Sequence, residues 1–297
     1  MKQTLSHILT ILAFCAAVSS CGHTTENGGE AEENAAGTTS SIHPANDKSG
    51  PECWNISIYL DLSDRLIKGQ GEPQSEPQML RDTAIITHLS DMFVEHVAKN
   101  RIVPCKDKFQ VFFYPTDGIP NASAISKKLT LDLENVAPQE KKHIVKNWTE
   151  NIRQNITPIY STTLDTKKWL GSDIWGFFKN KIKISTVRPN CRNILVILTD
   201  GYIFHEHSKI KQGANEYSYI LSQNIGIKDM KLIPCNKDLD NLEVLFVEIN
   251  PTQFSHGDLM QHIIGTWLEE MGVKHYDIIQ TDVSSNILPG IDNFIKQ

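Results

Sequence analysis

The sequence predicts an α/β fold: a doubly wound, mostly parallel six-stranded sheet with helices on both faces and an antiparallel edge strand. Two observations support this fold class. Apolar runs such as 56–60 and 194–198 are bounded by turn residues, which is typical of strands covered on both faces of a parallel sheet. Amphipathic stretches of helical length lie between such runs, and this alternation favours a doubly wound sheet with right-handed crossovers.

Six strands are expected from the apolar runs. In the third of them Leu129, Leu131 and Leu133 alternate with polar residues, which indicates a half-exposed strand at the edge of the sheet. The other runs are more continuously apolar and belong in its interior. The expected strands are 55–60, 109–114, 129–133, 194–198, 242–249 and 276–280.

Five helices are expected between and after these strands. Pro138 suits the first turn of a helix, Ser172-Asp173 offers N-cap chemistry, and Gly272 suits a helix end. The expected helices are 77–100, 138–156, 172–182, 258–271 and 287–295. In the first of them the residues spaced for one apolar face are Leu80, Ala84, Leu89, Phe93 and Val97.

Residues 1–20 have the pattern of an export signal. Lys2 precedes an apolar core at 8–18, which is too short to span a bilayer comfortably. The small residues directly before Cys21 resemble the lipobox of bacterial lipoproteins. The resemblance implies that Cys21 is lipidated and that the protein is anchored by lipid in the bacterial cell envelope, at its periplasmic face or surface. An ordinary secretory signal with an incidental cysteine is the alternative.

Residues 21–50 are expected to form a disordered acidic linker after the lipidated cysteine, because they hold too few apolar side chains to offset the entropy of ordering. Residues 51–297 are long enough and apolar enough to form one α/β domain. The formal net charge of the chain is -6, which argues against a nucleic-acid partner.

Two of the expected strands are followed directly by polar residues that could form a site. Asp61 follows the first strand and is followed by Ser63, while Asp200 follows the fourth strand. Parallel sheets place their sites beyond the carboxyl ends of their strands, so these side chains are expected to meet. The alternative is that both aspartates only form turns.

Asp61-Leu62-Ser63 followed by Leu198-Thr199-Asp200-Gly201 resembles the metal-ion-dependent adhesion site of the von Willebrand factor A-type domain. Leu170-Gly171-Ser172-Asp173-Ile174 resembles the family's intervening turn, with Ser172 in the place of a threonine. The resemblance covers about residues 53–297. It implies a binding module and not an enzyme, in which an acidic residue of an unidentified protein ligand completes the shell of a bound Mg²⁺ or Ca²⁺. The residues implied as metal ligands are Asp61, Ser63, Ser172 and Asp200.

Arg65 departs from the family pattern, because a second serine hydroxyl coordinates the ion at this position in the family. Arginine offers only donors and a positive charge, so Arg65 cannot be a metal ligand. Two geometries follow. Either Arg65 turns outward and the metal binds through extra waters, or its guanidinium takes the place of the ion and pairs with Asp61 or Asp200. The neighbouring acids Asp64 and Asp173 are expected to modulate the site.

Two other functions remain open on the sequence alone. Asp61, Asp64 and Asp200 could form the carboxylate cluster of a metal-dependent phosphoesterase. Such an enzyme would also need a general base or a basic clamp aimed at the site. A metal-free scaffold is the other alternative. The segment His205-Glu206-His207 lacks the spacing of a helical metal motif and is interpreted as a polar loop.

Four cysteines follow the linker, each a few residues before an expected strand: Cys53, Cys105, Cys191 and Cys235. In a parallel sheet these positions share the edge opposite the expected site, and an exported protein retains disulfides. The sheet order of the resembled family implies the pairs Cys53–Cys105 and Cys191–Cys235, because pairing Cys53 with Cys191 would leave Cys105 and Cys235 three strands apart. That separation is roughly 14 Å, too far for a bond. Four free buried thiols are the alternative.

Overall fold

The structure is a computed structural model, and it describes residues 53–67, 76–116, 119–166, 171–280 and 283–297. The chain divides into two units, Met1–Lys48 and Ser49–Gln297, and every described residue belongs to the second. The expected signal peptide, the lipidated Cys21 and the acidic linker therefore lie outside the described residues. Among the helices that the structure describes, none combines the length and apolarity needed to cross a membrane.

A six-stranded sheet forms the centre of the second unit. Its strands, in sheet order, are β11 (His275–Ile278), β10 (Leu242–Val247), β5 (Cys191–Leu198), β1 (Cys53–Leu60), β2 (Lys108–Phe112) and β3 (Thr130–Asp132). Neighbouring strands are parallel except that β3 runs antiparallel to β2 at the edge. This confirms the predicted fold class, a mixed α/β arrangement consistent with von Willebrand A and Rossmann-like folds.

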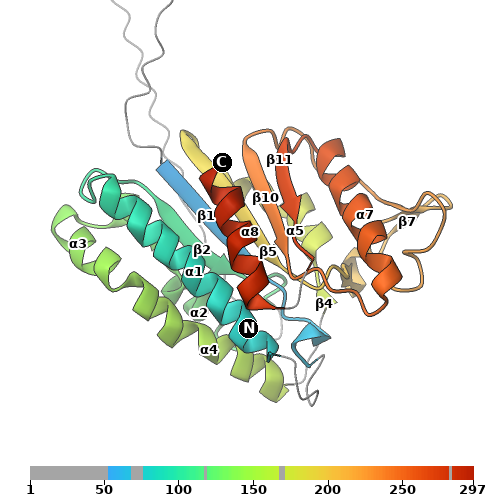
Figure 1. Cartoon of the computed structure of the whole chain (residues 1–297), viewed down its shortest axis with the longest axis horizontal. Helices are drawn as coiled ribbons and strands as arrows, with labels where there is room; N and C mark the ends of the chain where they lie inside the picture. Colours follow the sequence, from blue (N-terminus) through green and yellow to red (C-terminus); the bar gives the residue numbers. More distant parts are fainter. Residues whose placement is uncertain (1–52, 68–75, 117–118, 167–170, 281–282) are drawn as a thin grey trace, which may run out of the picture. The chain divides into compact units, whose positions relative to one another are not determined.

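Helices cover both faces of the sheet (Figure 1). One face carries α1 (Gln78–Lys99), α2 (Ala122–Lys128), α3 (Pro138–Lys146), α4 (Trp148–Thr166) and α8 (Ser284–Lys296). The other face carries α5 (Ile174–Asn180), α6 (Ile182–Thr186) and α7 (Gly257–Glu270). Residues 55–60 of β1 and 193–198 of β5 are buried without interruption, because both faces of these central strands are covered.

The structure differs from the expected helices in three places. Leu80 is 50% exposed, so the apolar face of α1 excludes it and is centred on Ile85, Leu89 and Phe93. The helix expected at 138–156 is divided into α3 and α4 at Asn147, whose side chain donates a hydrogen bond to the carbonyl of His143 and so competes with the helical pattern. The short helix α2 was not expected.

The segment around Ser172 also differs. Ser172 belongs to the two-residue strand β4 (Gly171–Ser172), which pairs with β6 (Phe204–His205). Asp173 is the N-cap of α5, because its carboxylate accepts the backbone N–H of Gly176 at 2.9 Å. The segment His205-Glu206-His207 is thus partly a strand and not only a polar loop.

The remaining elements are short. The crossover from β5 to β10 holds no α-helix in its described residues, and small strands take its place. These are β6, β7 (Lys211–Gln212), β8 (Glu216–Tyr217) and β9 (Lys231–Leu232). The 3-10 helices are η1 (Asp64–Ile67), η2 (Leu133–Asn135), η3 (Glu206–Ser208) and η4 (Phe254–His256).

A disulfide joins Cys53 to Cys191, with their Cα atoms 4.5 Å apart. The expected pairs Cys53–Cys105 and Cys191–Cys235 are therefore wrong, and so is the alternative of four free thiols. Cys53 and Cys191 lie directly opposite each other in the register of β1 and β5, so they face each other without any backbone movement. Cys105 and Cys235 are free thiols; Cys105 packs below the end of α1, and Cys235 follows β9.

Candidate functional site

The carboxyl ends of β1 and β5 hold Asp61 and Thr199 together. Leu60 lies opposite Leu198 in the sheet, and the backbone N–H of Asp61 donates to the carbonyl of Leu198 at 3.1 Å. The Asp61 carboxylate accepts the backbone N–H of Ser63 and the hydroxyl of Thr199, each at 2.8 Å. The side chain of Asp61 is therefore fixed in one orientation at the end of the central strands.

Asp200 follows Thr199, which binds Asp61 at the end of β5, and the charge of Asp200 acts on Asp61. Its carboxylate accepts the backbone N–H of Tyr202 at 3.1 Å, and the residue is buried. Burial raises the pKa of Asp61 to about 6; Arg65 opposes this rise, and the charge of Asp200 adds to it. The site thus holds two buried carboxyl groups that repel each other, and a cation between them would relieve that repulsion.

Ser172 reaches the same edge of the sheet through Tyr59. The Tyr59 hydroxyl donates to the carbonyl of Tyr114 at 2.6 Å and lies 3.3 Å from Ser172 Oγ. Burial raises the pKa of Tyr59 well above its ordinary value, and the charges of Asp61 and Asp173 add to the rise. Tyr59 therefore stays protonated and links the turn that carries Ser172 to β1.

The two acids expected to modulate the site occupy different environments. Asp64 is exposed at the start of η1. Asp173 is buried, caps α5, and accepts the hydroxyl of Ser208 at 2.7 Å. Asp173 thus fixes the turn after Ser172, whereas Asp64 faces solvent next to the site.

Arg65 follows the second expected geometry only in part, because it pairs with Asp61 but directs its terminal nitrogens to other acids. Its side chain is only 2% exposed, so it does not turn outward. Nη1 donates to Glu248 and Nη2 to Asp82, both at 2.9 Å, and Nε donates to the backbone carbonyl of Asp61 at 2.8 Å. The carboxylate of Asp61 is 3.9 Å from Nε. Both terminal nitrogens are thus bound to other acids and not placed between Asp61 and Asp200.

The carboxylates bound by Arg65 belong to a larger buried network. Gln78 Nε2 donates to both Asp82 and Glu248 at 2.9 Å. Arg81 Nε donates to Glu248 at 3.1 Å, and the Tyr160 hydroxyl donates to Asp82 at 2.7 Å. Two arginines therefore face two acids within this network. We call Arg65, Gln78, Arg81, Asp82, Tyr160 and Glu248 the buried charge network.

Burial and neighbouring charges shift the pKa values of Glu248 and Arg65 in this network. Burial and the neighbouring Asp82 raise the pKa of Glu248 to about 8, although Arg65 and Arg81 oppose the rise. Burial alone would lower the pKa of Arg65, but Asp82 and Glu248 outweigh it and raise that pKa above the ordinary value. Arg65 therefore remains charged and is the permanent cation beneath the Asp61 turn.

Glu248 could have been found from the sequence. It lies inside the expected strand 242–249, but β10 ends at Val247, so Glu248 directly follows the strand end as Asp61 follows β1. Asp82 offered no comparable signal, because it lies within a helix next to Arg81 and is typical of a solvated helical position. Thr199 stood in the quoted motif, but its bond to Asp61 was not predicted.

The donor set at the strand ends fits a hard divalent cation. The described part of the chain contains no group of three or more His, Cys, Asp or Glu side chains that could hold a metal. Mg²⁺ needs only one or two carboxylates, because it keeps several waters and accepts neutral oxygen ligands. For such an ion Asp61 and Asp200 would supply the carboxylates, and Ser63 and Ser172 would supply hydroxyls. For the phosphoesterase alternative, the nearest clamp residue, Arg65, is bound to Asp82 and Glu248.

Comparisons with known proteins give no family assignment. No protein-family model matches the chain, and no curated protein matches it. A solved structure of an aerotolerance-related membrane protein from Bacteroides fragilis, with multiple mutations to serine, aligns at 12% identity and a TM-score of 0.33, over 82% of this chain and 100% of that one. A pilus adhesin from Lactobacillus rhamnosus GG aligns at 11% identity and a TM-score of 0.35, over 82% of this chain and 30% of that one. Similarity at this level carries no argument about function.

Proposed function

We propose that this protein is a lipid-anchored binding module of the bacterial cell envelope, and that its Asp61 turn holds Mg²⁺ or Ca²⁺ for the capture of a protein ligand. The observation that carries the proposal is the pair of buried carboxyl groups, Asp61 and Asp200, at adjacent strand ends. The guanidinium of Arg65 directs both terminal nitrogens to Asp82 and Glu248, and only its Nε, at 3.9 Å, lies near the Asp61 carboxylate.

Each residue of the turn has a distinct role in this proposal. Thr199 and the backbone of Ser63 orient the Asp61 carboxylate, so little reorganisation accompanies binding. The hydroxyls of Ser63 and Ser172 supply neutral oxygen donors. A bound divalent cation would offer a coordination position to an acidic side chain of the ligand. The network below the turn keeps Arg65 charged but directed into the core.

The cation is tested by calorimetric titration of the full-length protein with Mn²⁺ and Mg²⁺. We expect the native protein to bind and Asp61→Asn to bind about tenfold more weakly or worse, because a neutral amide attracts the cation less. Asp64→Asn is the matched control: its carboxylate is three residues away but exposed, so affinity should stay the same. Thermal melts of both variants establish that each is folded.

Two results would contradict the proposal that the Asp61 turn binds a cation. If the native protein binds neither metal at millimolar concentration, the Asp61 turn is not a metal site. If Asp61→Asn binds as tightly as the native protein, the metal lies elsewhere. An acidic peptide added to the Mn²⁺-loaded protein then tests ligand capture, which should disappear when the metal is removed by a chelator.

The lipid anchor is tested at Cys21. Small residues before this cysteine support lipidation, so Cys21→Ala should move the protein from the membrane fraction to the soluble fraction and remove the added lipid mass. Cys15→Ala is the matched control, because Cys15 lies within the apolar core of the same signal and should not affect anchoring. Retention of Cys21→Ala in the membrane fraction at an unchanged mass would refute this part of the proposal.

A further inference from the structure

The outer edge of β3 is an open strand edge. Val111 N–H donates to the Leu129 carbonyl at 3.0 Å, and Leu133 N–H donates to the Asp107 carbonyl at 2.9 Å. In an antiparallel pair the backbone N–H and C=O groups of successive residues point alternately toward and away from the partner strand. The backbone groups of Leu129, Leu131 and Leu133 therefore point toward β2. The backbone groups of Thr130 and the N–H of Asp132 therefore point away from the sheet.

These outward groups have no hydrogen-bond partner within the described residues. The Thr130 hydroxyl is used, because it donates to the Ser126 carbonyl at 2.8 Å. The side chain of Asn151 likewise satisfies the Lys128 carbonyl at 2.9 Å. The carbonyls of Ser126 and Lys128, before the strand, thus have hydrogen-bond donors. Thr130 N–H, Thr130 C=O and Asp132 N–H remain available to another chain.

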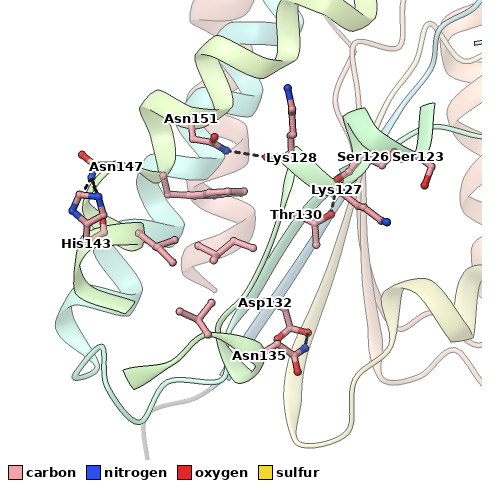
Figure 2. A pocket seen from close by; sticks show the side chains of 14 residues that line it. Ser123, Ser126, Lys127, Lys128, Thr130, Asp132, Asn135, His143, Asn147 and Asn151 are labelled. Atoms are coloured by element: carbon pink, nitrogen blue, oxygen red, sulfur yellow. Dashed lines mark hydrogen bonds between the residues drawn. The ribbon is translucent and has the colours of Figure 1, made fainter. Parts of the chain in front are cut away.

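A groove of about 780 Å³ lies alongside this edge, between β3 and the helices α3 and α4 (Figure 2). Its floor is apolar and consists of Leu131, Val136, Ile144 and Trp148. The indole nitrogen of Trp148 is buried and has no hydrogen-bond partner in the described part of the chain. Successive side chains of a β-strand point to opposite faces. A strand added at this edge could therefore place one set of side chains on the apolar floor and the other set in solvent.

The charge at one end of the groove is positive. Lys127 and Lys128 line it where α2 leads into β3, and both are exposed. Neither lysine has a carboxylate partner among the residues that the structure describes. Asp132 is the one acid that lines the groove in this part of the chain, and Arg188 neutralises it at 3.0 Å. A segment bound here would therefore gain from acidic side chains.

We propose that the outer edge of β3 and this groove bind an extended, acidic segment of a partner protein as an additional strand. Thr130 and Asp132 would hydrogen-bond its backbone, its apolar side chains would pack on the floor around Ile144 and Trp148, and a carboxylate would meet Lys127 and Lys128. This surface is formed at β3 and is separate from the Asp61 turn, so it does not rest on the proposed cation site.

The test uses the full-length protein and the synthetic peptide acetyl-Glu-Val-Thr-Val-Glu-amide, whose two valines fall on one face of a strand. We expect binding by calorimetry, with slowed amide hydrogen exchange at Thr130 and Asp132. The same peptide with its central backbone nitrogen methylated should bind about tenfold more weakly, because it loses a strand hydrogen bond while its charge is unchanged. Maltotriose, a neutral oligosaccharide probe, should not bind.

Matched variants at one position separate strand addition from simple charge attraction. Thr130→Pro removes an outward N–H and should weaken the peptide about tenfold. Thr130→Val keeps that N–H, replaces the hydroxyl with a methyl group, and should bind as the native protein does. Equal binding of the methylated peptide, unchanged exchange at Thr130 and Asp132, no peptide binding, or binding of maltotriose in place of the peptide would each overturn the proposal. The peptide comparison remains decisive if Thr130→Pro fails to fold.

Discussion

Replacing Arg65 with methionine should lower the free energy of unfolding by about 3–5 kcal/mol. The substitution preserves most of the side-chain length but removes the guanidinium that binds Asp82 and Glu248 at 2.9 Å. Both acids would remain buried with only Arg81 to compensate them, and an uncompensated buried charge is far more costly than a missing surface pair. Urea unfolding at neutral pH, followed by circular dichroism, measures the loss.

The matched control is Arg153→Met. Arg153 is 50% exposed and contacts Asp91 and Glu150 only at 3.8 and 3.6 Å, so its removal should cost about 1 kcal/mol or less. The prediction is wrong if the free energy of unfolding of Arg65→Met lies within about 1 kcal/mol of the native value, which is the size expected for an exposed pair. The buried charge network would then contribute little to stability.

Removing the disulfide should also have a large effect. The bond between Cys53 and Cys191 closes a segment of 138 residues, and closing so long a segment restricts the unfolded chain strongly. The double variant Cys53→Ala/Cys191→Ala should lose about 2–5 kcal/mol of stability. Treating the native protein with a reductant before urea unfolding should give a similar loss.

Cys235→Ala serves as the control, because Cys235 is a free thiol and its loss leaves the cross-link intact. Peptide mapping without reductant should yield Cys53 joined to Cys191, with Cys105 and Cys235 free. A double variant as stable as the native protein, or a map with Cys105 in a disulfide, would contradict the described arrangement.

The strand ends are the part of the site that the sequence could predict. An apolar run that stops at a polar residue marks a strand end, and parallel pairing then brings the residues after Leu60 next to those after Leu198 without knowledge of any side-chain rotamer. Glu248 fits the same rule. The rule works because it depends on local patterning and on a feature that all parallel sheets share.

The direction of Arg65 could not be predicted in that way. Its partners Asp82 and Glu248 are 17 and 183 positions away, on α1 and after β10. A long side chain next to a site can turn toward it or away from it with little backbone change. Which direction is favoured depends on acids that only the tertiary structure places.

The prediction of the disulfide pairs was wrong for a related reason. The sheet order was predicted correctly, but excluding the pair Cys53–Cys191 requires that all four cysteines form disulfides, whereas Cys105 and Cys235 are free thiols. Register decided the partner of Cys53: Cys53 and Cys191 are the first residues of their strands and lie opposite each other, whereas Cys105 lies before the start of β2. Register depends on the details of packing, which periodicity does not specify.

If the proposed ligand binds at the Asp61 turn, the placement of the disulfide has a mechanical consequence when the protein is pulled between that turn and its N-terminal side. Tension enters at Cys53, the first residue of β1, and leaves near the far end of that strand. The hydrogen bonds from β1 to β2 and β5 are then sheared together instead of being opened one after another. The bond from Cys53 to Cys191 passes part of the tension into β5 at the point of entry, so two central strands resist the pull as one covalently joined unit.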